Sequence, residues 1–294
     1  MRVRALTPLT FSLVAAAVLV AAEDRPWAVV TGASGGLGAC IAREAGRNGF
    51  NVLLAARRRD RLSRLADEIE RSYEVSAATC PCDLSRADGV LELQRASAAH
   101  DVRLAVLNAG VCRQGDLCRM SSAQVEEMLC INVASQSSLL QHFAQQMSGA
   151  GHGGHILVVA SSAAAAPGVP GVAVYAASKS FLRSLCDAVG AELRRNGGGV
   201  TVTCALPSAI DTEFQAASGL ATAKVFTLPG VRRLPGGVVL SAEAVAKTVT
   251  TAALRGRPEI VPGLLPRAFV GLSDRRLLPR PLARAIAAFC FSTD

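Results

Sequence analysis

The sequence predicts an α/β fold built on a doubly wound parallel sheet, and two observations point to it. Short apolar runs with strand-like composition alternate with longer segments of helical period, so each crossover is long enough to place the next strand parallel. A glycine cluster lies between the first strand and the first helix, where a βαβ unit turns sharply. No internal repeat or polar linker interrupts residues 25–262, so we expect them to form a single Rossmann-type domain.

The expected strands are short runs rich in valine, leucine and alanine, whereas the expected helices repeat apolar residues three and four positions apart. The predicted strands are Trp27–Thr31, Asn51–Ala56, Glu74–Cys80, Val102–Leu107, Gly154–Ser161, Gly199–Leu206 and Glu259–Val261. The predicted helices lie near residues 37–48, 59–72, 85–99, 122–147, 173–196 and 241–255. The segment 208–240 is rich in glycine and proline and is interpreted as a loop that covers the substrate.

The amino-acid composition excludes several classes of protein. Of the 294 residues, 50% are hydrophobic and 18% are charged, which excludes a disordered chain and a coiled coil. The net charge of +8 comes from 31 basic and 23 acidic residues, but aromatic residues make up only 4%. Because nucleic-acid binders combine clustered cations with aromatic stacking residues, we expect no nucleic-acid partner. The charge fits a phosphate-bearing ligand, an acidic lipid surface, or a genome that favours arginine over lysine.

The nine cysteines and four histidines predict no metal site. No cysteine pair has the two-residue spacer of a zinc knuckle, and most cysteines lie in apolar runs, so we expect buried free thiols. His152 and His155 flank two glycines ahead of a strand, which is typical of a loop.

The turn after the first strand has the composition of a phosphate-binding loop. Glycines let the backbone turn sharply and let a pyrophosphate approach the free N–H groups at the positive end of a helix. The turn reads Thr31-Gly32-Ala33-Ser34-Gly35-Gly36-Leu37-Gly38. Its place within a βαβ pattern indicates a dinucleotide site.

The second strand ends in cations rather than in an acid. An NAD-binding unit places a carboxylate here to hold the ribose 2′-hydroxyl, but this chain has Arg57, Arg58 and Arg59. A carboxylate would repel a 2′-phosphate, whereas a guanidinium binds it through two hydrogen bonds, so we predict NADP(H) as cofactor. The alternative is a solvated helix N-terminus, which disfavours cations unless an anion meets them.

Tyr175 and Lys179 form the candidate proton-transfer pair. They lie four residues apart in a predicted helix, which places both side chains on one face. A nearby ammonium favours the phenolate, so we expect the pKa of Tyr175 to be lowered and the phenol to act as a general acid or base. Ser162 lies thirteen residues upstream, at the end of a strand where this fold opens its ligand crevice.

With these motifs, residues 25–262 resemble the short-chain dehydrogenase/reductase family. Its Thr-Gly-x-x-x-Gly-x-Gly turn, its Asn-Ala-Gly after the fourth strand and its tetrad are all present in order. The resemblance implies Asn132, Ser162, Tyr175 and Lys179 as catalytic residues. It implies that Tyr175 gives the proton, Ser162 holds the oxyanion, Lys179 also holds the nicotinamide ribose, and Asn132 positions a water.

The same resemblance implies a set of cofactor contacts, with Asp83 on the adenine side and Thr212 at the carboxamide. The predicted cofactor residues are Gly32, Ser34, Gly36, Leu37, Gly38, Arg57, Arg58, Asp83, Asn108, Ala109, Gly110, Tyr175, Lys179, Pro207 and Thr212. Two departures stand out. Ser208 follows Pro207 where the family usually has glycine, and Ala163–Ala166 follows the serine where a glycine is common.

These residues predict an NADPH-dependent oxidoreductase that reduces a ketone on a hydrophobic substrate such as a 3-oxoacyl thioester or a steroid. The reverse reaction, oxidation of an alcohol, uses the same residues. The alternative is a non-catalytic nucleotide sensor or scaffold at a membrane, although such a protein has no need for the tyrosine and lysine pair. By analogy with the family we expect a homodimer or homotetramer, paired through the long helices near 122–147 and 173–196.

Both chain ends carry lipophilic segments. Residues 1–24 hold two arginines and then an uncharged apolar run, which fits a signal anchor, a cleaved signal peptide or a buried terminal helix. The first two place the protein in the endoplasmic reticulum membrane or secretory pathway, and the third in the cytoplasm. Residues 263–294 form a basic amphipathic tail that prolines break into short helices, suited to a membrane surface, a substrate mouth or the domain itself.

Overall fold

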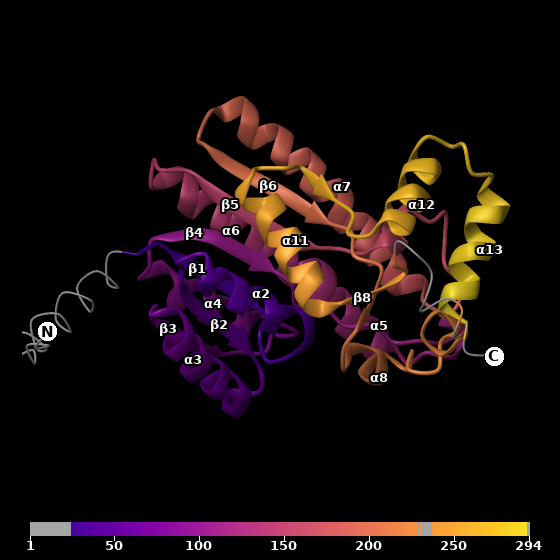
Figure 1. Cartoon of the computed structure of the whole chain (residues 1–294), viewed down its shortest axis with the longest axis horizontal. Helices are drawn as coiled ribbons and strands as arrows, with labels where there is room; N and C mark the ends of the chain where they lie inside the picture. Colours follow the sequence, from indigo (N-terminus) through magenta and orange to yellow (C-terminus); the bar gives the residue numbers. More distant parts are fainter. Residues whose placement is uncertain (1–24, 229, 231–236, 293–294) are drawn as a thin grey trace, which may run out of the picture.

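The computed structural model describes residues 25–228, 230 and 237–292, and within them seven strands form one parallel sheet (Figure 1). The order across the sheet is β3-β2-β1-β4-β5-β6-β9. The strands are β1 (Trp27–Thr31), β2 (Asn51–Ala56), β3 (Ala77–Pro81), β4 (Val102–Leu107), β5 (Gly154–Val159), β6 (Val200–Ala205) and β9 (Glu259–Ile260). The chain winds outward from β1 to β3 and then restarts at β4 on the other side, which confirms the doubly wound fold and creates a ligand crevice between β1 and β4.

Helices cover both faces of the sheet, and successive strand residues alternate between the two layers. Val30 packs in the cluster that contains Ile41, whereas its neighbour Val29 packs in the cluster that contains Phe143. The first face carries α2 (Gly36–Arg47), α3 (Arg59–Tyr73) and α11 (Ala242–Leu254). The second carries α4 (Ala87–Ala98), α6 (Ser135–Gly149) and α7 (Ala173–Asn196). Burial on both faces explains why the strands are almost wholly apolar.

Two predicted elements have different bounds in the structure. The third strand begins at Ala77 rather than at Glu74, because Glu74 has a φ of 54° and ends α3 in the left-handed conformation. The predicted helix 122–147 is divided into α5 (Ser122–Leu129), a π-helical turn at Cys130–Ala134, and α6. The π turn lies next to the ligand crevice, as such turns often do.

The segment after β6 contains short elements at the carboxyl edge of the sheet. They are β7 (Ala209–Asp211), α8 (Phe214–Ser218), α9 (Lys224–Thr227) and β8 (Val239–Ser241), and β7 pairs with β8. Together with Cys112, Met128 and Tyr175, the residues Leu220 and Val225 form a third hydrophobic cluster. Of the predicted substrate-covering loop, residue 229 and residues 231–236 lie outside the described residues.

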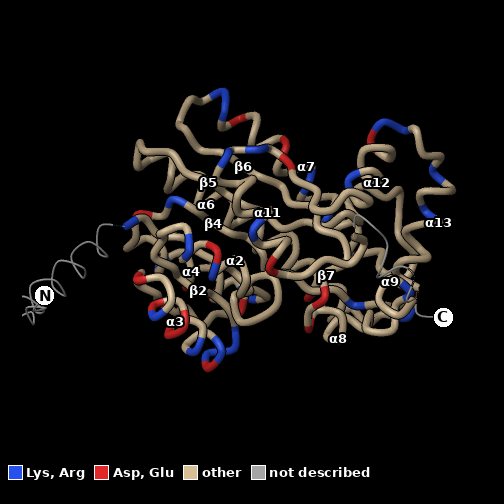
Figure 2. Tube along the Cα trace, in the orientation of Figure 1, with Lys and Arg blue, Asp and Glu red and all other residues tan. Residues whose placement is uncertain are grey.

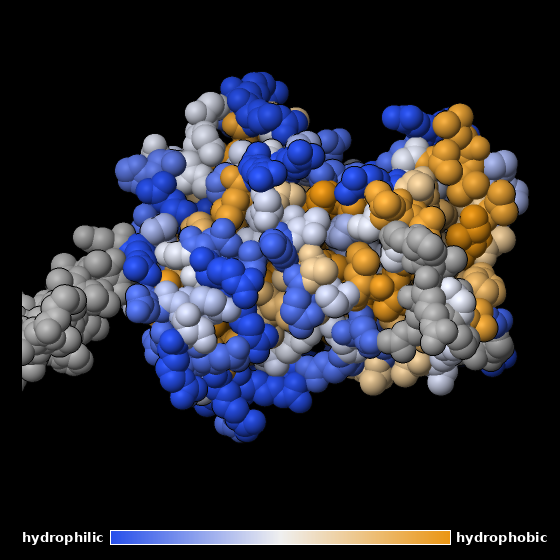
Figure 3. All heavy atoms as spheres, in the orientation of Figure 1, coloured by the Kyte–Doolittle hydropathy of each residue, from blue (hydrophilic) through white to orange (hydrophobic). Residues whose placement is uncertain are grey.

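The tail folds into α12 (Leu264–Asp274) and α13 (Arg280–Phe291), as the prolines predicted. Arg183 of α7 holds α12, because its Nη2 lies 2.6 Å from Asp274 while its Nε lies 2.6 Å from Glu259. Apolar residues gather on the surface over both helices (Figure 3), and basic side chains follow the same segments (Figure 2). Within the described part of the chain, no helix combines the length and apolar character needed to cross a membrane. Residues 1–24, with the predicted signal or anchor, lie outside the described residues.

Candidate active site

A cavity of about 630 Å³ opens along the carboxyl edge of the sheet, within the size range of small-molecule sites. The predicted cofactor residues all line it, together with Ser162, Tyr175 and Lys179. Asn132 is the predicted site residue that does not line it. Apolar residues from the third cluster and from the tail line the other end, among them Leu220, Phe226, Phe269 and Ile286. The cavity therefore joins a polar, glycine-rich half to an apolar half.

The glycine turn packs so closely against neighbouring atoms that a side chain would not fit at Gly32 or Gly38. Gly32 and Gly36 have φ angles of 67° and 53°, in the left-handed region that favours glycine. A Cβ on Gly32 would lie 2.8 Å from Asn108 Nδ2, and one on Gly38 would overlap the carbonyl oxygen of Gly32. Gly36, Leu37 and Gly38, the first residues of α2, line the cavity, and the N-terminus of a helix is where a diphosphate binds.

Replacing Gly38 by alanine should disrupt this turn. The new methyl group would push α2 away from the Gly32 carbonyl, so we expect a loss of about 1–3 kcal/mol in unfolding free energy and at least tenfold weaker dinucleotide binding. Denaturant unfolding and calorimetric titration measure the two effects. The control is Gly149→Ala in α6, where a Cβ would meet nothing within 4 Å. Equal behaviour of the two variants would contradict the assigned role of Gly38.

Thr31 and Asn108 hold the two sides of the crevice together. Thr31 Oγ1 accepts hydrogen bonds from the backbone nitrogens of Asn108 at 2.9 Å and Ala109 at 3.0 Å, and donates to the Val106 carbonyl at 3.1 Å. Asn108 Nδ2 returns a hydrogen bond of 2.9 Å to the Thr31 carbonyl. These bonds join the ends of β1 and β4, so the glycine turn and the Asn-Ala-Gly segment keep a fixed separation.

Asp83 and the cations Arg57 and Arg58 after β2, which are predicted to lie on the adenine side, line the cavity. Asp83 Oδ1 accepts from the Ser85 nitrogen at 3.0 Å and from its hydroxyl at 2.9 Å, which fixes the carboxylate in the turn after β3. Arg57 is exposed, and Arg58 bends back to donate from Nε to the Ser34 hydroxyl at 3.0 Å. Arg58 therefore connects the end of β2 to the glycine turn.

Tyr175 and Lys179 lie close together in the lining of the cavity. One turn of α7 separates them, and Lys179 Nζ lies 5.7 Å from the centroid of the Tyr175 ring. Lys179 Nζ also donates to the carbonyl oxygen of Val159, the last residue of β5, at 2.8 Å. Both side chains are buried, and that bond fixes the ammonium at the carboxyl end of β5.

The prediction of a lowered tyrosine pKa is wrong for this structure. Burial raises the pKa of Tyr175, the thiol of Cys112 raises it further, and a hydrogen bond with Ser161 lowers it by less. Burial also lowers the pKa of Lys179 to about 8. Desolvation therefore outweighs the attraction that the four-residue spacing suggested. At neutral pH the phenol keeps its proton, which suits it to donate one.

Ser161 and the predicted Ser162 both line the cavity beside Tyr175, and the pKa shift of Tyr175 singles out Ser161 as a partner. Ser161 is buried, and its hydroxyl is the hydrogen-bonding partner that favours the phenolate. Ser162 begins a 3₁₀ turn at Ser162–Ala165, and its backbone nitrogen donates to the Pro207 carbonyl at 2.9 Å. Both serines follow β5 closely, because that strand ends at Val159.

Asn132 does not line the cavity, and both polar atoms of its side chain form hydrogen bonds with neighbouring residues. Its Oδ1 accepts from the Val111 nitrogen at 2.8 Å, and its Nδ2 donates to the Val111 carbonyl at 2.8 Å and the Ser178 hydroxyl at 3.1 Å. It therefore holds the segment after β4 against α7. Gly110 leaves room for the Lys179 side chain beside this segment, since a Cβ at position 110 would lie 3.2 Å from Lys179 Nζ.

The departures from the family pattern cause no strain. Among the described residues, only Glu74 and Arg276 have positive φ without being glycine, so the backbone at Ser208 does not require glycine. Thr212 lines the cavity, and its hydroxyl accepts a hydrogen bond from the Phe214 nitrogen at 3.3 Å. Thr212 thus stays in reach of the glycine turn, with its Cβ 3.4 Å from the position of a Cβ on Gly36.

Comparison with known proteins agrees with this geometry. The family model of short chain dehydrogenases matches residues 26–222, which is more than half of the chain. The chain belongs to the short-chain dehydrogenase family. An uncharacterized oxidoreductase of Myxococcus xanthus is 36% identical to this short-chain dehydrogenase over 191 residues, 64% of this chain and 74% of that protein. A very-long-chain 3-oxoacyl-CoA reductase of Laccaria bicolor is 33% identical over 60% of this chain and 52% of that protein.

Solved structures extend the similarity to nearly the whole domain. A short-chain dehydrogenase/reductase from Burkholderia phymatum in complex with NAD has a TM-score of 0.74 and 26% identity, covering 87% of this chain and 95% of that one. A putative NAD(P)-dependent gluconate 5-dehydrogenase from Beutenbergia cavernae with bound NADP has a TM-score of 0.71 and 29% identity, covering 80% and 94%. The protein is therefore a family oxidoreductase whose structural neighbours bind either nicotinamide dinucleotide.

Proposed function

We propose that this dehydrogenase uses NADPH to reduce the ketone of a hydrophobic substrate, with Tyr175 as proton donor. The observation that supports the proposal is that Tyr175 lines the same cavity as the glycine turn and also packs in the third hydrophobic cluster, whose residues Leu220 and Val225 line that cavity too. A carbonyl held against the phenol would have its hydrocarbon part among apolar side chains. Its carbon would face the half that accepts the dinucleotide.

The mechanism assigns one task to each polar group. When bound, the reduced nicotinamide supplies a hydride to the carbonyl carbon. Tyr175 is buried and protonated at neutral pH, so it gives its proton to the carbonyl oxygen. Ser161 donates a hydrogen bond to the same oxygen as negative charge develops. Lys179, fixed on the Val159 carbonyl, favours the phenolate left behind through its charge. Asn132 and Gly110 keep the floor of the site in place.

The arginines after β2 support NADP(H) over NAD(H). Arg58 and Arg57 line the cavity beside Ser34, and no acid ends β2 to hold a ribose 2′-hydroxyl. The dinucleotide fits the residues present, because the glycine turn at the start of α2 lines the cavity and the cations offer partners for a phosphate. The NAD complex among the structural neighbours makes this preference a matter for measurement.

Replacing Arg58 by alanine should reduce the selectivity for NADPH. Charge-assisted hydrogen bonds contribute about 1.5–3 kcal/mol each, so the ratio of kcat/KM for NADPH to that for NADH should fall about tenfold or more. Arg71→Ala, in the last turn of the same helix α3, is the matched control and should leave the ratio unchanged. A wild-type enzyme that uses NADH as well as NADPH would contradict the proposed cofactor.

The apolar half of the cavity supports a lipid-like substrate. Its lining includes Leu220, Val225, Phe226, Leu265 and Phe269, from the segment after β6 and from α12. The similarity to a 3-oxoacyl-CoA reductase points the same way. The test is NADPH oxidation with a series of 3-oxoacyl thioesters and steroid ketones, in which kcat/KM should rise with apolar area. Turnover of small polar ketones alone would contradict the substrate class.

The alternative function is a nucleotide-binding sensor or scaffold without chemistry. It would bind NADPH tightly and oxidise none with any ketone of the series. The buried pairing of Tyr175 with Lys179 argues against it, because a binding-only site has no use for a desolvated proton donor.

We further propose a membrane surface as partner for the tail. Leu264 and Leu277 expose 68% and 65% of their surface on α12 and just after it, and Arg275 and Arg276 follow α12. Apolar residues with basic neighbours suit an anionic bilayer surface. Pairing through α5, α6 and α7 into a homodimer or homotetramer, and the secretory destination expected from residues 1–24, remain predictions.

A further inference from the structure

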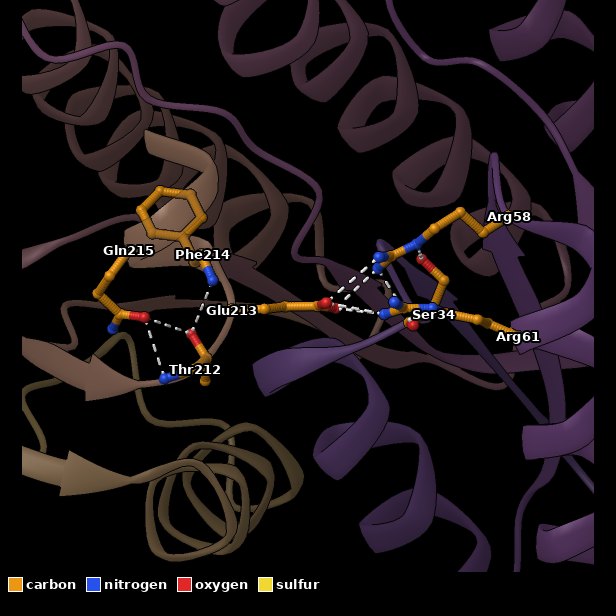
Figure 4. A network of polar contacts seen from close by, with 7 residues as sticks. All are labelled: Ser34, Arg58, Arg61, Thr212, Glu213, Phe214 and Gln215. Carbon is orange, nitrogen blue, oxygen red and sulfur yellow. Dashed lines mark hydrogen bonds and ion pairs between the residues drawn. The ribbon is translucent and has the colours of Figure 1, made fainter. Parts of the chain in front are cut away.

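An ion-pair network beside the predicted adenine side of the cavity joins the segment after β7 to the β2–α3 connection (Figure 4). Glu213, just after β7, reaches across to the cations of the β2–α3 connection. Arg58 Nη2 lies 2.9 Å from Glu213 Oε1, and Arg61 Nη1 lies 2.8 Å from both carboxylate oxygens. Residues about 150 positions apart in the sequence therefore meet through a single carboxylate.

The carboxylate lies over the glycine turn. A Cβ on Gly35 would overlap Glu213 Oε1 and would lie 3.0 Å from Arg58 Nη2. Arg58 also donates from Nε to the Ser34 hydroxyl at 3.0 Å and from Nη2 to the Ser34 carbonyl at 3.2 Å. We call this set of contacts the adenine-end latch, and its residues are Ser34, Arg58, Arg61 and Glu213.

The cations of the latch are arranged to bind an anion. Arg58 and Arg61 flank the first residues of α3, and both guanidiniums bind the same carboxylate of Glu213. Across the described residues, Glu213 is the only carboxylate that forms a salt bridge with either arginine. The two guanidiniums hold the pKa of Glu213 below its usual value, so the carboxylate is charged at neutral pH. Glu213 is therefore an anion from the chain itself that is bound by the Arg58 and Arg61 guanidiniums.

We propose that Glu213 occupies the place of the cofactor's 2′-phosphate, that Arg61 is a further phosphate contact, and that the phosphate displaces Glu213 from the latch. The proposal rests on the proposed use of NADP(H). A 2′-phosphate and the carboxylate cannot share the two guanidiniums, because like charges at that separation repel. The phosphate binds the two guanidiniums more strongly than the carboxylate does, because it carries about −1.5 to −2 charge and three acceptor oxygens, whereas the carboxylate carries one charge.

Displacement has a structural consequence. Glu213 belongs to the segment Thr212–Gly219, which also lines the cavity through Phe214 and Ala217. While the latch is closed, this segment is held against the glycine turn. When a 2′-phosphate takes the arginines, the segment is released from the cofactor-binding half. Glu213 therefore lowers the affinity for a 2′-phosphate and couples its binding to the segment beside the substrate.

The test uses two nucleotides that differ in the 2′-phosphate, namely 2′,5′-ADP and 5′-ADP. In Glu213→Gln we expect 2′,5′-ADP to bind about three- to tenfold more tightly than in wild type. The substitution removes the two half-exposed ion pairs of Glu213, so no carboxylate competes with the 2′-phosphate for Arg58 and Arg61. Binding of 5′-ADP should stay within twofold. The control is Glu68→Gln, which removes a carboxylate that pairs with Arg43 instead. The Glu68 and Glu213 side chains are similarly exposed, at 45% and 46% of their surface. Calorimetric titration gives the dissociation constants.

Hydrogen exchange of the peptide that covers 209–220 provides the second readout. Exchange should be faster in Glu213→Gln without nucleotide, and 2′,5′-ADP but not 5′-ADP should raise it in wild type. Unchanged or weaker 2′,5′-ADP binding in Glu213→Gln would overturn the proposal, as would exchange that does not respond. Glu213→Ala repeats the measurement if the glutamine variant folds poorly.

The same data separate this proposal from the proposed cofactor. Wild type that prefers 2′,5′-ADP, with no gain in Glu213→Gln, leaves NADP(H) use standing and overturns the latch. Wild type without preference, with a preference that emerges in Glu213→Gln, supports Glu213 as the occupant of the phosphate site but overturns both its displacement by the phosphate and NADP(H) as the working cofactor. No preference in either protein overturns both.

Discussion

Replacing Tyr175 by phenylalanine is expected to lower kcat/KM for ketone reduction by about 10²–10⁴-fold, the range that a positioned general acid contributes. Phenylalanine keeps the ring that packs in the third hydrophobic cluster and removes only the hydroxyl. The binding of NADPH should therefore change little, and the loss should fall on kcat. Initial rates of NADPH oxidation and a separate binding titration measure the two quantities.

The chain supplies its own control for this substitution, because it has only two tyrosines. Tyr73 ends α3 and its ring faces the guanidinium of Arg47, away from the cavity. Tyr73→Phe should retain nearly full activity. If Tyr175→Phe also retained more than about a tenth of the wild-type activity, the proton would have to come from another group.

The second large effect is expected at the serines after β5, where the structure distinguishes two neighbours. Ser161→Ala should reduce kcat about 10²–10³-fold, the usual loss when one donor to an oxyanion is removed. Ser162→Ala should stay within about threefold of wild type, because the contact that fixes Ser162 in the structure is made by its backbone nitrogen. Steady-state kinetics of the two single variants decide between them. The opposite ranking would return the role to Ser162 and contradict the geometry of the Tyr175 hydroxyl.

The sheet and the cavity could be predicted from the sequence because they depend on local patterns. A parallel strand is buried on both faces, so β1, β2 and β4 are continuous apolar runs that composition reveals. The glycine turn depends on φ angles and close contacts that only glycine permits, and the residue type reports both.

The features that sequence reasoning missed depend on tertiary contacts. The π turn at Cys130–Ala134 coincides with the bonds of Asn132 to Val111, twenty-one residues away. The direction of the Tyr175 pKa shift follows from burial, which spacing along a helix does not report. Glu213 gave no local signal, because its partner Arg58 lies 155 residues away.

Hydride transfer to the substrate is the central claim, and isotope transfer tests it most directly. NADPH deuterated at the transferable C4 position should be incubated with the purified full chain and a long-chain 3-oxoacyl thioester. Mass spectrometry of the product then reports whether the new C–H bond carries the label. The account predicts an alcohol one mass unit heavier, formed by wild type and nearly absent with Tyr175→Phe. Tight binding of NADPH without labelled alcohol from this or any other ketone of the series would contradict it.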